Sequence, residues 1–472
     1  MMTLSLAVRN LLRNRRRSLA TLLATLLAMA IGSTSILLFG GFSANINYMM
    51  HTHHVRTGGH LQIQHRDFYL YGNGNPSAYG INNYKELIAA IQADEVLRNM
   101  VLVASPTLQF GGIAGNYSAN VSRTIIDNGF VAKDINRMHE WNDFDVKKQE
   151  PPFALEGAPE DAAIVGIGVA RVLQLCDALN IPNCPKPAKK AKPDSAGLPD
   201  DIAQLSEQNA TDASKSSTKS TPDPRRLDVL VVNAGGAPNV TAVEVIKAQE
   251  QGIKELDEVY MMMQFSYIQK LMYGSSPPKA TSIMLQLRHS DQIPAAIERL
   301  KPILAKFSVN QPLAVLDFRT LNLFYVQTIR MFDTIFGFVF ILIGGIVLFT
   351  VSNTMNTAVV ERTVEIGTLR AIGLRRSGIR RLFVTEGALI GLCGALLGVV
   401  LALLLAALVN QSGLEWLPPG NVEPLPLTIT VFGETRMILG TTIGLIVIAV
   451  LSAWWPAYRA ADLKIVDALR HV

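Results

Sequence analysis

The run from Met331 to Arg381 joins a membrane-length apolar segment directly to a charged one. Its apolar part holds about 20 residues, the length with which a helix crosses the hydrocarbon core of a bilayer. In the charged part, 361–373, helical spacing separates three apolar residues from four charged ones, namely Val364, Leu369 and Ile372 from Glu361, Arg362, Glu365 and Arg370. The pattern predicts a membrane helix followed by a short amphipathic helix that packs through one face and presents charges on the other.

Three further apolar runs reach the same length. They cover 19–42, 382–409 and 437–456, and with a span at 328–359 they make four predicted transmembrane helices. The first is expected to remain uncleaved, because its apolar run continues past Ala30, beyond the length of a signal-peptide core. Since 49% of the 472 residues are hydrophobic and only 17% are charged, an ordinary soluble enzyme is excluded. The length still leaves room for one large soluble domain.

The distribution of arginine and lysine predicts the orientation of these spans. Positive residues concentrate in 1–18, which is predicted to form an amphipathic elbow, in 360–381 and in the tail 457–472. Short basic flanks of this kind stay in the cytoplasm. The connection 410–436 has three glutamates against one arginine and is expected on the opposite side. Both termini are therefore predicted inside, and the segment 43–327 outside.

Residues 43–327 show the short alternating patterns of a mixed α+β domain. For example, Ser282–Leu287 is typical of a strand and Ile293–Phe307 of a helix. The order of such patterns predicts two lobes, one of them assembled from both ends of the segment. The stretch 185–226 is rich in Lys, Pro, Ser, Asp and Thr and poor in aromatic residues, which predicts a flexible insertion.

The three cysteines are too few for a disulfide scaffold. Cys393 falls within a predicted span. Cys176 and Cys184 lie in the segment predicted outside the inner membrane, where a disulfide is chemically allowed. The sequence leaves open whether these two cysteines are bonded or are two free thiols.

Motifs for catalysis and nucleotide binding are missing from the sequence. It contains no Gly-x-x-x-x-Gly-Lys-Ser/Thr loop for phosphates, no His-Glu-x-x-His zinc motif and no nucleophile elbow, so we predict a chain that is not itself an enzyme. Its basic residues flank the predicted spans instead of forming a patch with aromatics, which disfavours nucleic acid as a partner. A metal site or a solvated linker could explain the five histidines near the start of the soluble domain, and we predict no metal there: His51, His53, His54, His60 and His65.

The charged segment carries a specific resemblance. Its pattern Glu-Arg, x-x-Glu-Ile-Gly, x-Leu-Arg-Ala-x-Gly is followed by Glu386 and a row of glycines, Gly387, Gly391, Gly394 and Gly398. This resembles the permease domain shared by MacB, LolC, LolE and FtsX. Val466–Arg470 resembles the closing motif of that family, with Asp467 where a proline is common. The resemblance covers nearly the whole chain except the insertion.

The resemblance implies both a fold and a set of site residues. The fold is an α-helical membrane protein with four transmembrane helices and a large periplasmic α+β domain between helices 1 and 2. Residues 360–381 would be the coupling helix that docks in a groove of a cytoplasmic ATPase, through Glu361, Arg362, Glu365, Gly367, Arg370 and Gly373. The glycine row has the spacing that lets helices approach closely in lipid, either within one subunit or at a seam between two subunits.

The function implied is that of a permease subunit of an ABC transporter in the bacterial inner membrane. Such a subunit holds no cofactor, because ATP and Mg are bound by two copies of the partner ATPase, and it works with a second permease copy as a homodimer or a related heterodimer. Its substrate would be a lipoprotein, a lipid or another amphipathic molecule, with a periplasmic or outer-membrane protein as acceptor. The alternative is an FtsX-like protein that transmits motion to a periplasmic enzyme without transport.

Overall fold

The computed structural model describes residues 18–146, 151–181, 184, 223–251, 254–309, 311–417 and 424–464. These residues form two compact units. The helical unit holds the described chain up to His51 and from Asn322 onward, and the sheet unit holds Thr52–Leu321. Three predicted features lie outside the described residues, namely 1–17 of the elbow, 185–222 of the insertion, and 465–472 of the tail with its closing motif.

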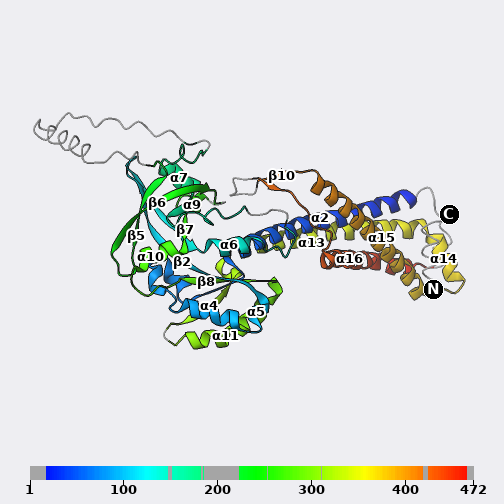
Figure 1. Cartoon of the computed structure of the whole chain (residues 1–472). Coiled ribbons are helices and arrows are strands. Elements are labelled where there is room, and N and C mark those ends of the chain that lie inside the picture. Colours follow the sequence, from blue (N-terminus) through cyan, green and yellow to red (C-terminus); the bar gives the residue numbers. More distant parts are fainter. Residues whose placement is uncertain are drawn as a thin grey trace, which may run out of the picture. The chain divides into compact units, whose positions relative to one another are not determined.

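The helical unit contains four helices that are long and apolar enough to cross a membrane. They are α2 (Ser18–Gly58), α13 (Leu323–Glu361), α15 (Arg376–Gln411) and α16 (Thr435–Asp462), drawn as a bundle in Figure 1. A short helix, α14 (Thr363–Ala371), connects α13 to α15, and two short strands, β10 (Glu415–Trp416) and β11 (Leu425–Pro426), pair between α15 and α16. The predicted class, with four apolar helices and an α+β domain between the first and the second, is confirmed.

Helix α2 extends beyond the predicted span 19–42. It continues to Gly58, and the sheet unit begins only at Thr52. Residues 43–57 contain neither glycine nor proline, so nothing in them interrupts the helix. Gly59 has a φ of +75°, the left-handed conformation that commonly follows a helix end, and its N–H donates to the carbonyl of Val55 at 3.1 Å.

The four predicted packing glycines all lie at helix crossings inside this one chain. A Cβ at Gly387 would lie 2.6 Å from the Cβ of Ala453 on α16, and one at Gly391 would lie 2.9 Å from that of Ala449. Further along the same face of α15, a Cβ at Gly394 would lie 2.6 Å from the Cβ of Met29 on α2. The glycines therefore let α15 contact α2 and α16 at once.

The fourth glycine marks the closest of these crossings. A Cβ at Gly398 would lie 2.3 Å from the Cβ of Ser33 and 2.7 Å from the carbonyl oxygen of Ala30. The hydroxyl of Thr34 donates to the carbonyl of Gly398 at 3.1 Å, and the hydroxyl of Ser33 donates to the carbonyl of Ala395 at 3.3 Å. Close backbone contact and interhelical hydrogen bonds are the forces that hold helices together in lipid.

The sheet unit is built on nine described strands that pair in the order β3-β7-β4-β6-β5-β2-β8-β1-β9. They are β1 (Leu61–His65), β2 (Val101–Asn116), β3 (Val121–Phe130), β4 (Ala162–Gly166), β5 (Arg226–Val232), β6 (Pro238–Gln249), β7 (Met261–Gln264), β8 (Ser282–Leu287) and β9 (Leu313–Asp317). Its helices are α3 (Phe68–Tyr71), α4 (Tyr84–Ala93), α5 (Leu97–Met100), α6 (Ala132–His139), α7 (Ile167–Val172), α9 (Lys254–Asp257), α10 (Phe265–Tyr273), α11 (Ile293–Phe307) and α12 (Phe318–Leu321).

Strand β2 belongs to two lobes. Its first half, Val101–Thr107, pairs with β8, which continues through β1 to β9. Its second half, Leu108–Asn116, pairs with β3 and, over Gly112–Gly115, with β5, and the further pairing of β3 with β7 closes a ring of strands. The first lobe is therefore assembled from both ends of the segment between α2 and α13, as the sequence predicted.

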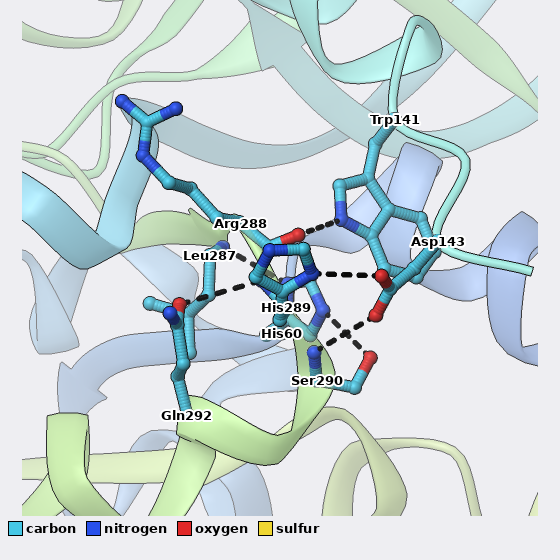
Figure 2. Close-up of polar contacts among 8 residues, drawn as sticks. All are labelled: His60, Trp141, Asp143, Leu287, Arg288, His289, Ser290 and Gln292. Atoms are coloured by element: carbon cyan, nitrogen blue, oxygen red, sulfur yellow. Dashed lines mark hydrogen bonds and ion pairs between the residues drawn. The ribbon is translucent and has the colours of Figure 1, made fainter.

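Two of the predicted histidines belong to separate local contacts in the sheet unit. Residue His65 accepts a hydrogen bond from the N–H of Asp67, whereas His60 is fully buried. Figure 2 shows His60 among residues from the end of β8 and the loop after α6. In the part of the chain that the structure describes, no group of three or more His, Cys, Asp or Glu side chains could hold a metal ion.

The hydrogen bonds of His60 show that it does not activate the neighbouring serine. Its Nδ1 accepts the N–H of Leu287 at 3.0 Å, so the neutral ring carries its proton on Nε2. That Nε2 lies 3.1 Å from the hydroxyl of Ser290 and donates to it, so it cannot take the serine's proton. Nearby, the indole N–H of Trp141 donates to the carbonyl of Arg288 at 3.0 Å. The cluster is a buried polar connection between the β8 end and the loop after α6.

Replacing His60 with Leu should leave the N–H of Leu287 buried without its acceptor. A lost partner of this kind costs about 1–3 kcal/mol of folding stability. Urea unfolding of the full chain, followed by tryptophan fluorescence, measures the loss, with the exposed His53→Leu as the matched control. Equal midpoints for the two variants would contradict the role assigned to His60.

Replacing Gly398 with Ala should force α2 and α15 apart, because the new methyl group meets the backbone of α2. Overpacking of this kind costs about 1–3 kcal/mol. Thermal unfolding in detergent should show a lower midpoint for G398A than for G440A, since a Cβ at Gly440 on α16 meets nothing within 4 Å. If both variants melt at the same temperature, the crossing is looser than described here.

The structure joins Cys176 and Cys184 in a disulfide, with their Cα atoms 6.1 Å apart. Counting thiols with a maleimide in denaturant should therefore give one per chain before reduction, from Cys393, and three afterwards. Closing a loop with a sequence separation of 8 stabilises the fold by about 2–3 kcal/mol in the chain-entropy model, so C176S should unfold more easily. Three reactive thiols before reduction would exclude the bond.

Candidate functional site

The candidate site is formed where α13 ends and α14 begins. Residue Arg362 is the residue after α13 and the residue before α14, with φ −107° and ψ 18°. Its own N–H donates to the carbonyl of Ala358, and its carbonyl accepts the N–H of Ile366, at 3.2 and 2.9 Å. The hydroxyl of Thr363 donates to the carbonyls of Val359 and Val360. The chain thus changes direction at one residue without losing its hydrogen bonds.

The side chain of Arg362 turns inward and forms an ion pair with Glu386 of α15. The Nη1 atom lies 3.0 Å from Oε1, and the two side chains are 12% and 3% exposed. Breaking a pair buried to this degree leaves a charge in an apolar setting, which is far more costly than breaking a surface pair. The next residue, Gly387, gives α16 the space to lie against the same part of α15.

Two further arginines connect this region to the end of α16. The guanidinium of Arg370 donates to the carbonyl of Leu463, the residue that follows α16, where a positive charge complements the helix dipole. Arg376 pairs with Asp462 at 3.1 Å, but both side chains are largely exposed, so this pair contributes little. On the second turn of α15, the guanidinium of Arg380 lies 4.4 Å from the ring centre of Tyr458, a cation–π contact.

The buried face of α14 differs from the predicted one. Its buried residues are Ile366 and Gly367, and Ile366 belongs to the same apolar cluster as Val359, Ile379 and Phe383. Leu369 is partly buried against this cluster, whereas Val364 and Ile372 are 46% and 79% exposed. The prediction for Val364 and Ile372 was therefore wrong. Since α14 ends at Ala371, Ile372 already lies outside the helix that its periodicity assumed.

The prediction that Arg362 and Arg370 face away from the packed side was also wrong. Both guanidinium groups are used inside the helical unit, by Glu386 and by the end of α16. The side chains of Glu361 and Glu365 are exposed, and the structure gives them no ion pair or hydrogen bond among the described residues.

We call the outward side of this region the exposed α14 face, consisting of Glu361, Val364, Glu365, Thr368 and Ile372. It ends at Gly373, whose φ of +103° reverses the chain, with the N–H of Leu374 donating to the carbonyl of Leu369 at 3.1 Å. A side chain would strain this turn, which accounts for the glycine. Gly367 differs, since it is buried within α14. The face presents the carboxylates of Glu361 and Glu365 and the apolar side chains of Val364 and Ile372. The contacts of Arg362, Arg370 and Ile366 hold α14 against the rest of the helical unit.

The predicted residues thus separate into three places. The predicted coupling residues from Glu361 to Gly373 lie together around α14, the glycines of α15 lie at its crossings with α2 and α16, and the cysteines lie in the sheet unit.

Sequence reasoning gave no role to Glu386 beyond the motif and missed Asp462 and Leu463. No local pattern marks those two, because their partners are on α14 and α15, far away in the sequence.

Comparison with known proteins places this site within a single domain. Residues 334–465 match the family model described as FtsX-like permease C-terminal, which includes α14, Glu386 and the end of α16. A solved structure was also found. A crystal structure of the extracellular domain of the ABC-type transporter YknZ from Gram-positive bacteria gives a TM-score of 0.28 at 14% identity, over 54% of this chain and 99% of that one.

Two curated relatives carry descriptive names. LolC of Haemophilus influenzae, a lipoprotein-releasing system transmembrane protein, is 28% identical over 157 residues, which is 33% of this chain and 38% of LolC. MacB of Escherichia coli K12, a macrolide export ATP-binding/permease protein, is 34% identical over 143 residues, which is 30% of this chain and 20% of MacB. The chain spans less than half the length of each. Residues 334–465 thus carry an FtsX-like permease C-terminal domain, and the chain is similar to ABC transporter permeases of the LolC and MacB kind.

Proposed function

We propose that this chain is the membrane subunit of an ABC transporter in a bacterial inner membrane, and that the exposed α14 face docks on a separate cytoplasmic ATPase. The observation that carries the proposal is the division of charges around α14. Arg362 and Arg370 are bonded inside the helical unit. Glu361 and Glu365 stay exposed next to Val364 and Ile372. A face with an apolar centre and charged neighbours has the composition of a protein interface.

The absence of a nucleotide-binding loop from the sequence agrees with an energy source in another subunit. Closure of the ATPase on ATP would push α14, which is braced against α15 and α16, and so shift the bundle of apolar helices. The sheet unit, predicted outside the cytoplasm, would then act on the substrate. The names of LolC and MacB favour a lipoprotein, a lipid or another amphipathic molecule as that substrate, handled by two permease copies.

The double variant E361Q/E365Q tests the docking role, because it removes both exposed charges and keeps side-chain size. Affinity purification of the full chain from its native membranes should recover an ATPase subunit that carries a nucleotide-binding loop. For the double variant we expect at least about tenfold less of it, equivalent to a loss of about 1.4 kcal/mol in binding.

The matched control is E415Q, which neutralises an exposed glutamate in the connection between α15 and α16. It should recover as much ATPase as the wild type. Equal recovery by the double variant and the control would rule out docking through Glu361 and Glu365. The lipids and lipoproteins in the same preparations identify the substrate class by mass spectrometry.

A further inference from the structure

The exposed α14 face is connected to α15 by three routes, namely a covalent turn, a buried ion pair and the apolar cluster that Ile366 shares with Ile379 and Phe383, and the first two differ greatly in stiffness. The covalent route is the turn at Gly373, where residues 371–377 are all exposed and a Cβ at Gly373 would meet nothing within 4 Å. An exposed turn with few buried contacts transmits force poorly, because its dihedral angles can change at little cost. The second route is the buried contact between Arg362 and Glu386.

The buried route is stiff because separation of its two groups is unfavourable. The side chain of Glu386 is 3% exposed, on a stretch of α15 whose buried residues include Phe383 and Ile390. If Arg362 moved away, a charge would remain in surroundings that solvate it badly. The geometry of the bend at Arg362 also fixes this side chain to both α13 and α14, so a displacement of either helix moves the guanidinium.

Helix α15 is the element through which such a displacement would reach the rest of the helical unit. Its glycines place it in direct contact with α16 at Gly387 and Gly391 and with α2 at Gly394 and Gly398. Helices packed this closely move together, since sliding would bring a Cβ into backbone atoms. Glu386 is adjacent to the first of these glycines, so a force on its carboxylate acts at the start of the packed row.

We propose that Arg362 and Glu386 form a positioning pair that makes α14 and α15 move as one body. The inference rests on the proposed function, because it assigns the pair the task of transmitting the displacement that ATPase docking would cause. Neither residue belongs to the exposed α14 face. Loss of the pair should therefore leave ATPase binding intact and separate it from the response of α15.

The test measures the distance between spin labels at A371C on α14, outside the exposed α14 face, and R381C on α15, both exposed positions, in the C393S background. In the complex with the copurified ATPase, the wild-type distance distribution should be narrow and the same with ADP as with trapped ATP. In E386Q the distribution should broaden and change on ATP trapping, while the amount of bound ATPase stays at the wild-type level.

Three further variants separate positioning from a general loss of structure. R362K keeps the charge, and the exchanged pair R362E/E386R restores opposite charges, so both should give a narrower distribution than E386Q. D462N removes the exposed pair with Arg376 and should behave as the wild type. If E386Q keeps the wild-type distribution in both nucleotide states, the proposal is wrong. If the wild type itself recovers no ATPase, the proposed function fails instead, and distances in the chain alone still report whether the pair joins α14 to α15.

Discussion

The helical unit depends on how closely α15 approaches its neighbours. In lipid, apolar side chains gain little by leaving one apolar environment for another, so helices associate through close contact and buried polar groups. The missing side chains at Gly394 and Gly398 supply that contact with α2, and the hydroxyl of Thr34 adds a hydrogen bond to the carbonyl of Gly398. Nearer the start of the same face, Gly387 brings α16 against α15, next to the buried Glu386. The pair with Arg362 therefore depends on the packing of the glycines.

The sequence predicted those parts of the helical unit that have a strong local signal. Four apolar runs, the charged segment after the second run and the glycine spacing are properties of neighbouring residues, and the structure contains all of them. The face of α14 was less predictable, because its burial depends on the end of α16. The partners of Arg370 and Arg376 are Leu463 and Asp462, and no periodicity within 361–373 reports on residues so far away.

In the sheet unit too, elements with a strong local pattern were predicted, whereas features that depend on distant residues were not. Strand β8 and helix α11 were predicted with their observed bounds, since each has a clear apolar pattern. Strand β3 was missed, because its Arg, Asp, Asn and Gly residues are unusual in a strand and its stability comes from pairing with β2 and β7. The sequence also left the state of Cys176 and Cys184 open, because it gives the spacing of the cysteines but not the path of the chain between them.

Strand β2 gives the two lobes a common register. Its even-numbered residues Ala104, Leu108, Phe110 and Ala114 all contact one continuous apolar core, although the first lies in the lobe with β8 and the others in the ring of strands. Adding a single residue near Thr107 would rotate every later side chain of the strand to the opposite side, so Phe110 would exchange places with its solvent-facing neighbours. The lobes therefore cannot vary in length independently along this strand, whereas the loops that join the other strands carry no such constraint. Insertions and deletions of residues in this domain are therefore expected in the loops that join its strands.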